Sequence, residues 1–168
     1  MTEEFARRLQ DVVEGVRAES ARREGPRKAG SAAAEEFRRH LRRAVMAEAE
    51  RMVRGASGVL ASLGLRMRVS PEEVRVEAIP GARSPEAHPP WLGFRCREPG
   101  HPDARVVVTE AQWRVDDPRT PLPESPCSIR HVSGDDSPAG IAELREFLAV
   151  AIEDFASCVT KYDTLPRP

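Results

Sequence analysis

The chain has 168 residues and a formal net charge of −1, with 32% charged and only 5% aromatic side chains. This length fits one ordinary domain with an aliphatic core, and a charge so near zero gives no overall field to attract nucleic acid or a membrane. The three cysteines are too few for a disulfide scaffold. No stretch reaches the ~20 apolar residues of a spanning helix, and the first residues contain no apolar signal segment, so we expect a cytoplasmic protein without membrane contact.

The first expected element is an amphipathic helix over residues 3–23. Its apolar residues recur at helical spacing and define one stripe: Phe5, Leu9, Val12, Val13 and Val16. The segment 24–30 then brings Gly, Pro and Gly, which interrupt helices and indicate a linker. The chain is therefore expected to divide into an N-terminal helix with its linker (1–30) and a single α+β domain (31–168).

A second, long helix is expected from Ser31, a favoured N-cap, to Leu63, with Gly64 closing it in the left-handed conformation. At about 33 residues it would be ~50 Å long, more than a compact domain of this size requires. Several of its apolar residues are small and alternate at spacings typical of a helix–helix seam. The seam residues expected to mediate self-association are Leu41, Val45, Ala49, Met52, Ala56 and Val59.

After Gly64 the apolar residues alternate with period two, which predicts strands. The stronger runs cover residues 65–69, 74–78, 91–97 and 104–115, and a weaker one covers 127–132. Connectors rich in Pro and Gly separate these runs and favour an antiparallel meander. A final helix over 138–162, capped by Ser137, carries a broad apolar stripe.

This order of elements predicts an α+β fold. It would contain two N-terminal helices, the second of them long, followed by an antiparallel meander of four to five strands. The C-terminal helix would pack on the sheet through its apolar stripe. Two tryptophans lie in the strands, Trp91 and Trp113. They serve either sheet packing or the anchoring of a partner, since Trp is enriched at interface hot spots.

Four side chains have the types and number that a tetrahedral zinc ion binds. The first two, Cys96 and His101, flank a Pro-Gly turn. The second two, Cys127 and His131, would lie ~13 Å apart along one face of a strand, so they reach one ion only if that strand is interrupted. The alternative is a buried cysteine with histidines on loops or the surface, and no metal.

The polar side of the long helix carries six arginines that form a possible phosphate-binding row. They are Arg38, Arg39, Arg42, Arg43, Arg51 and Arg54. Glutamates alternate with them, and Glu50 stands four residues before Arg54, a spacing that favours ion pairs along a helix. The alternative to nucleic-acid binding is a solvated face of such pairs.

The sequence contains no phosphate-binding loop and no visible nucleophile–base pair, so no catalytic residue is assigned. We expect a non-enzymatic protein-interaction or assembly module that forms a homodimer through the long helix, or that binds another protein. Two alternatives remain open at this point. One is a nucleic-acid-binding protein that uses the arginine row, and the other is a zinc-binding protein that uses the Cys/His set.

Overall fold

The computed structural model describes residues 3–81, 89–117 and 125–163, with side chains from residue 30 onward and at Glu14 and Arg17. Two helices, α1 (Glu3–Gly55) and α2 (Ser57–Ser62), precede the strands β1 (Leu65–Val69), β2 (Glu73–Ala78), β3 (Trp91–Arg97), β4 (Val107–Arg114) and β5 (Cys127–Ser133). The last element is the helix α3 (Pro138–Asp163). The predicted α+β fold is confirmed.

The five strands form one antiparallel sheet whose spatial order is the chain order, β1-β2-β3-β4-β5. This is the meander that the short alternating runs predict, because each strand pairs with the next along the chain. Successive side chains of a strand point to opposite sides of a sheet. The sheet therefore has an inner face, which lies against α1 and α3, and an outer face, which carries the other half of the strand residues.

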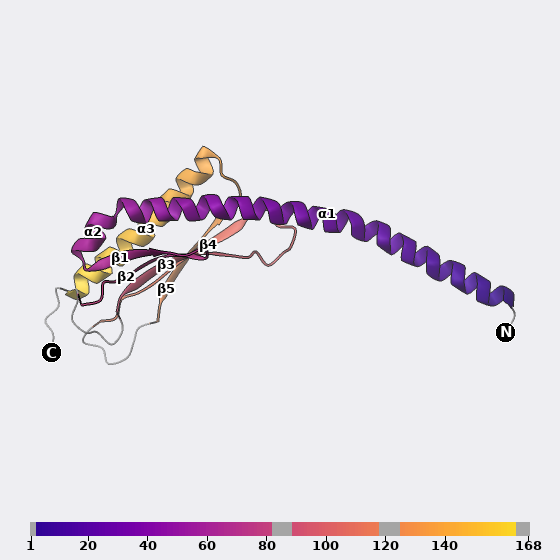
Figure 1. Ribbon diagram of the computed structural model, residues 1–168, viewed down its shortest axis with the longest axis horizontal. Helices are drawn as coiled ribbons and strands as arrows, with labels where there is room; N and C mark the ends of the chain where they lie inside the picture. Colours follow the sequence, from indigo (N-terminus) through magenta and orange to yellow (C-terminus); the bar gives the residue numbers. More distant parts are fainter. Residues whose placement is uncertain (1–2, 82–88, 118–124, 164–168) are drawn as a thin grey trace.

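Both long helices lie on the same side of the sheet, so the molecule has two layers (Figure 1). The strands contribute buried residues such as Val76, Leu92 and Phe94 to the core between the layers. The helices contribute Leu41, Val45, Ala49, Val53, Leu144, Leu148, Ala151, Ile152, Phe155 and Val159. The predicted packing of the C-terminal helix on the sheet is confirmed, because six residues of its stripe are buried in this core.

The start of α3 is fixed by the two side chains before it. The Gly140 amide donates to the Ser137 hydroxyl at 3.1 Å, and the Ser137 amide donates to the Asp135 carboxylate at 3.0 Å. The hydrogen bonds from Ser137 hold the pKa of Asp135 below its ordinary value. Ser137 is thus the N-cap that the sequence predicts, and it satisfies an amide that the first helical turn leaves unpaired.

The break predicted over residues 24–30 is absent, since α1 is helical from Glu3 to Gly55. A proline inside a helix removes a single backbone hydrogen bond and crowds one turn. Long runs of Ala, Arg and Glu flank Pro26 on both sides, and these residues have high helix propensity. The helix therefore continues through the proline, and it passes unbroken across the domain boundary expected at residue 30.

Two helices do precede the sheet, but the first is the long one and the break lies at Ala56. The Ala56 amide donates to the carbonyls of Met52 and Val53, each at 3.1 Å. Gly55 and Gly58 surround this point, and glycine has low helix propensity. The chain then turns into β1 at Gly64, whose φ of 70° is the left-handed conformation expected from the sequence.

The packing of α3 gives the first prediction. Replacement of Leu148, which is fully buried, by alanine should lower the free energy of unfolding by about 2–5 kcal/mol, because it leaves a cavity in the core. Val150, two residues along the same helix, is 45% exposed. Val150→Ala should change stability by less than about 0.5 kcal/mol. Urea denaturation of both variants checks this, and equal losses would contradict the packing described here.

Candidate interaction surfaces

The seam predicted to mediate self-association lies largely inside the chain's own core. Leu41, Val45 and Ala49 are at most 1% exposed, and they face the inner side of the sheet as part of the core cluster. Met52 and Ala56 are half-buried against the same cluster, whereas Val59 is 63% exposed. Most of the apolar surface expected to attract a second copy is therefore already covered by the strands.

Two arginines of the predicted phosphate-binding row hold the connection between β3 and β4. Arg38 is only 5% exposed. Its Nη1 donates to the carbonyl oxygens of Pro102 at 2.6 Å and Ala104 at 2.8 Å, and its Nη2 donates to Glu35 at 2.7 Å. Arg42 pairs with Glu98 in the same connection. These guanidinium groups therefore attach the connection to α1, where Arg38 is buried and Arg42 is partly exposed.

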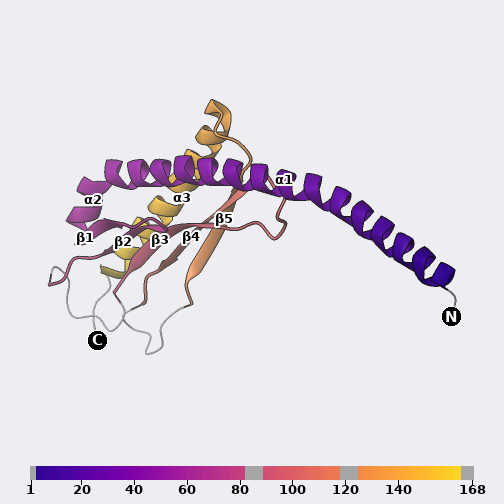
Figure 2. The ribbon, with the colours of Figure 1, turned by 45° about the vertical axis from the view of Figure 1, so that its right-hand side comes forward.

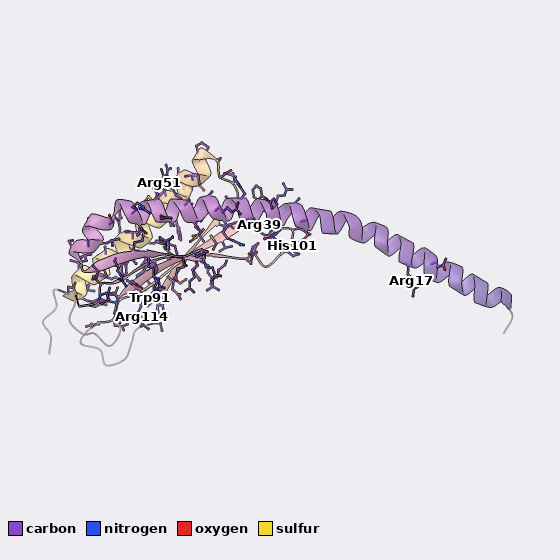
Figure 3. The ribbon with its side chains drawn as sticks, viewed as in Figure 1. Arg17, Arg39, Arg51, Trp91, His101 and Arg114 are labelled. Carbon is purple, nitrogen blue, oxygen red and sulfur yellow. The ribbon has the colours of Figure 1, made fainter. Side chains whose placement is uncertain are left out.

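Three more arginines of that row pair with glutamates on the same helix. Arg39 donates to Glu36 at 2.9 Å, Arg51 pairs with Glu48, and Arg54 pairs with Glu50 at the spacing expected from the sequence. Arg43 is exposed. The side chains of Arg39 and Arg51 are 52% and 60% exposed, and Figure 3 shows Arg51 on the side of α1 away from the sheet. This arrangement favours the solvated, ion-paired face over a row of free phosphate-binding groups.

A buried carboxylate joins α1 to α3. Glu48 accepts a hydrogen bond from Arg145 of α3 at 2.6 Å and also pairs with Arg51, and its side chain is only 8% exposed. Burial by itself raises the pKa of Glu48, but the hydrogen bonds from Arg145 and Arg51 outweigh burial and lower the pKa below its ordinary value. The two helices thus share a charged contact beside their apolar packing.

The four candidate zinc ligands do not converge. Cys96 and His131 lie on the inner face with Thr109 of β4 between them, which separates their strands by about 10 Å. His101 is exposed in the β3–β4 connection, where its Nδ1 accepts the Asp103 amide at 3.3 Å. Cys127 is exposed at the start of β5, four residues from His131.

Two of these side chains have other surroundings in the structure. Burial raises the pKa of the Cys96 thiol to about 11. The His131 ring stacks on Phe147 of α3, with 5.4 Å between ring centroids. Among the described residues, no three His, Cys, Asp or Glu side chains are placed to hold one metal ion. The described structure therefore does not bring the four predicted Cys/His ligands together.

The outer face of the sheet is a feature that the sequence analysis did not single out. Seven arginines and three glutamates share this face, according to the strand registers. The arginines are Arg66, Arg68, Arg75, Arg95, Arg97, Arg114 and Arg130, and the glutamates are Glu73, Glu77 and Glu110. Neither long helix covers them, because both lie on the inner face (Figure 1).

Ion pairs across the strands order part of this outer face. Glu110 of β4 is 4% exposed. It pairs with Arg97 of β3 and with Arg130 of β5 at 3.2 Å, and it accepts the Ser128 hydroxyl at 3.1 Å. Burial raises the pKa of Glu110, but these hydrogen bonds outweigh burial and lower it below the ordinary value. The carboxylate thus ties three neighbouring strands together.

A second row of the outer face contains no acid. Arg68 of β1 stands directly opposite Arg75 of β2, and Arg75 in turn stands opposite Gly93 of β3. The next row holds Trp91, opposite Arg114 of β4, and Figure 3 shows these two side chains on the side of the sheet away from α1. The Arg75 guanidinium lies over the Trp91 ring, 4.7 Å from its centroid.

The sequence does contain the signal for this face, since arginines alternate with apolar residues along 65–69 and 74–78. Alternation shows that arginines of one strand share a face. It does not show how strands align, or whether a helix covers that face. The registers and the position of both helices on the inner side supply this information.

The contacts of Arg38 give a second prediction. Arg38→Met removes the donors to the Pro102 and Ala104 carbonyls, and it should lower the free energy of unfolding by about 1–3 kcal/mol. Arg39→Met, which removes an exposed pair on the adjacent position, should stay within about 0.5 kcal/mol of the unmodified chain. Denaturant titration measures both, and an Arg38→Met variant as stable as Arg39→Met would contradict the assigned role.

The Glu110 network gives a third prediction, for acid stability. Because the folded-state pKa of Glu110 lies below the ordinary value of 4.5, its contribution is present above pH 4.5 and disappears as pH falls through the folded-state pKa. Glu110→Gln should therefore be less stable than the unmodified chain near pH 7, by about 1–3 kcal/mol. The difference should narrow below pH 4.5.

Unfolding free energies at three pH values between 7 and about 3.5 measure this difference. The matched control is Glu72→Gln, because Glu72 is exposed in the turn before β2. The control should follow the unmodified chain throughout. A Glu110→Gln deficit that stays constant as the pH is lowered would contradict the linkage to this carboxylate.

Comparisons with known proteins do not assign the chain to a group. No family model matches it, and neither a curated protein nor a solved structure shows significant similarity to it. No helix within the described parts of the chain combines the length and apolarity needed to cross a bilayer. The surfaces above are therefore interpreted from their own chemistry.

Proposed function

We propose that this chain is a non-enzymatic interaction and assembly module that self-associates as a homodimer through the N-terminal arm, residues 3–30 of α1. The observation that carries this proposal is the extent of α1 beyond the sheet (Figures 1 and 2). The helix has 53 residues, which corresponds to about 80 Å. Ala34 is buried, whereas Gly30 is exposed, so the arm begins where α1 leaves the body.

A helical arm without tertiary contacts has low conformational stability in water. Isolated helices gain little stability without tertiary contacts, and glycine and proline weaken them further. The arm contains Gly15, Gly25, Pro26 and Gly30. It also contains the apolar stripe from Phe5 to Val16, at the spacing of one helix face. A second helix that covers this stripe would stabilise the arm in the way a coiled coil does.

The apolar stripe of the arm suits the same stripe on a second copy of this chain. Two identical stripes that face each other form a two-fold symmetric contact, the commonest arrangement of homodimers.

The packing of α1 on the sheet holds the start of the arm in place. The apolar residues Leu41, Val45 and Ala49 fix α1 to the sheet, and the same helix continues into the arm without a break. An arm held in this way projects in one direction and loses little freedom when it pairs, which favours association. The seam residues thus act in assembly by anchoring the arm rather than by forming the contact.

A matched pair of substitutions tests the proposal. By helical spacing Leu9 lies within the stripe, and Ala18 lies on the opposite side of the arm. We expect the unmodified chain to be a dimer by light scattering. Leu9→Glu should weaken the dimer by at least about tenfold, or ~1.4 kcal/mol. Ala18→Glu adds the same charge and should leave the mass unchanged.

A further control distinguishes a dimer contact at the arm from one at the seam predicted from the sequence. Val59 is the exposed member of that seam, so Val59→Glu should not alter the mass in solution. An unmodified chain that is monomeric at high micromolar concentration would refute self-association. Dissociation by Val59→Glu but not by Leu9→Glu would instead place the contact at α2.

A further inference from the structure

The outer face of the sheet holds more positive charge than its own carboxylates balance. Seven arginines face three glutamates there, and each glutamate is already paired. Glu77 pairs with Arg66 at 2.9 Å, and Glu73 pairs with Arg95 at 3.1 Å and Arg75 at 3.5 Å. Glu110 is shared by Arg97 and Arg130. Asp116, just after β4, lies 3.6 Å from Arg114. A net positive surface remains.

The excess is concentrated around Arg68 and Arg75. Like charges directly opposite each other on paired strands destabilise a sheet, and Arg68 stands directly opposite Arg75. Arg75 shares its carboxylate with Arg95. Arg68 is exposed, and no carboxylate of the described residues pairs with it. A local conflict of this kind is relieved when an anion binds between the two guanidinium groups.

An aromatic surface adjoins this cationic pair. Trp91 is partly exposed, and Glu77 and Arg114 are its neighbours on the adjoining strands. The Arg75 guanidinium already stacks on its ring. The second tryptophan, Trp113, is 6% exposed on the inner face, so Trp91 is the one available to a ligand. The face therefore combines unbalanced arginines with a flat ring.

We propose that this outer face binds single-stranded nucleic acid. Phosphates would bind Arg68, Arg75 and Arg114, and a base would stack on the Trp91–Arg75 pair. Single strands present unpaired bases that stack on aromatic rings and guanidinium planes. A duplex keeps its bases stacked internally, and an acidic polypeptide has carboxylates but no planar base. The combination of arginines with an accessible tryptophan therefore favours single strands over these two ligands.

Fluorescence anisotropy with a labelled oligothymidylate of about 15 nucleotides tests the proposal, because this length matches common single-strand site sizes. We expect binding at low salt that weakens steeply between about 50 and 200 mM. The double variant Arg68→Gln, Arg75→Gln should bind at least about tenfold more weakly and with a smaller salt slope. The oligonucleotide should also quench the fluorescence of Trp91.

The matched control removes two arginines from the other side of the molecule. Arg39→Gln, Arg43→Gln takes the same charge from the exposed side of α1, so its affinity should stay within about twofold of the unmodified chain. Thermal melting should show that the Arg68, Arg75 double variant is folded, because the substitutions remove two like charges that stand opposite each other on paired strands. Trp91 quenching is an independent measure that does not require any substitution.

Four results would overturn the proposal. The first is no binding at low salt, and the second is equal loss of affinity in both double variants. The third is competition by poly-glutamate as strong as that by unlabelled oligothymidylate, which would assign the face to an acidic protein. The fourth is equal affinity for a duplex without quenching of Trp91, which would exclude base stacking.

Discussion

The packing of α1 across the inner face of the sheet is the constraint on which the rest of the molecule depends. A five-stranded meander has two faces, and burial of Val76, Leu92 and Phe94 requires a cover on one of them. The stripe from Leu41 to Val53 and the buried face of α3 together supply this cover. Because the stripe is used inside the chain, it is not available to a second copy. The arm and the outer face lie outside this helix–sheet packing.

Charged side chains at the edge of the core add hydrogen bonds and ion pairs to this apolar packing. Arg38 gives its donors to two backbone carbonyls of the β3–β4 connection, and Glu48 receives Arg145 from α3. Such contacts stabilise little on their own, yet leaving one partner buried and alone is costly. They therefore fix where the connection and α3 lie on α1. Arg38 and Arg42, which the sequence places in a possible phosphate-binding row, therefore bind the β3–β4 connection within the chain.

The proposed surfaces differ in how they follow from the fold. The arm extends from the body because α1 does not break at Pro26, and its apolar residues recur at the spacing of one helix face. The outer face exists because α1 and α3 share the inner side (Figure 2). The register that sets Arg68 opposite Arg75 contradicts the usual rule for paired strands, and departures from local rules concentrate at functional positions.

Local features follow from the amino-acid sequence alone. They are the strands with their period of two, the stripe of α3, the Ser137 cap and the left-handed Gly64. These depend on neighbours within a few residues, so spacing reveals them. The tertiary structure was needed to show that Leu41 and Val45 pack in the core of their own chain rather than against a second copy. It also showed that Cys96 and His131 stay apart, and that the arginines of different strands share one face. Those outcomes depend on register and layer order, which join residues far apart in the chain.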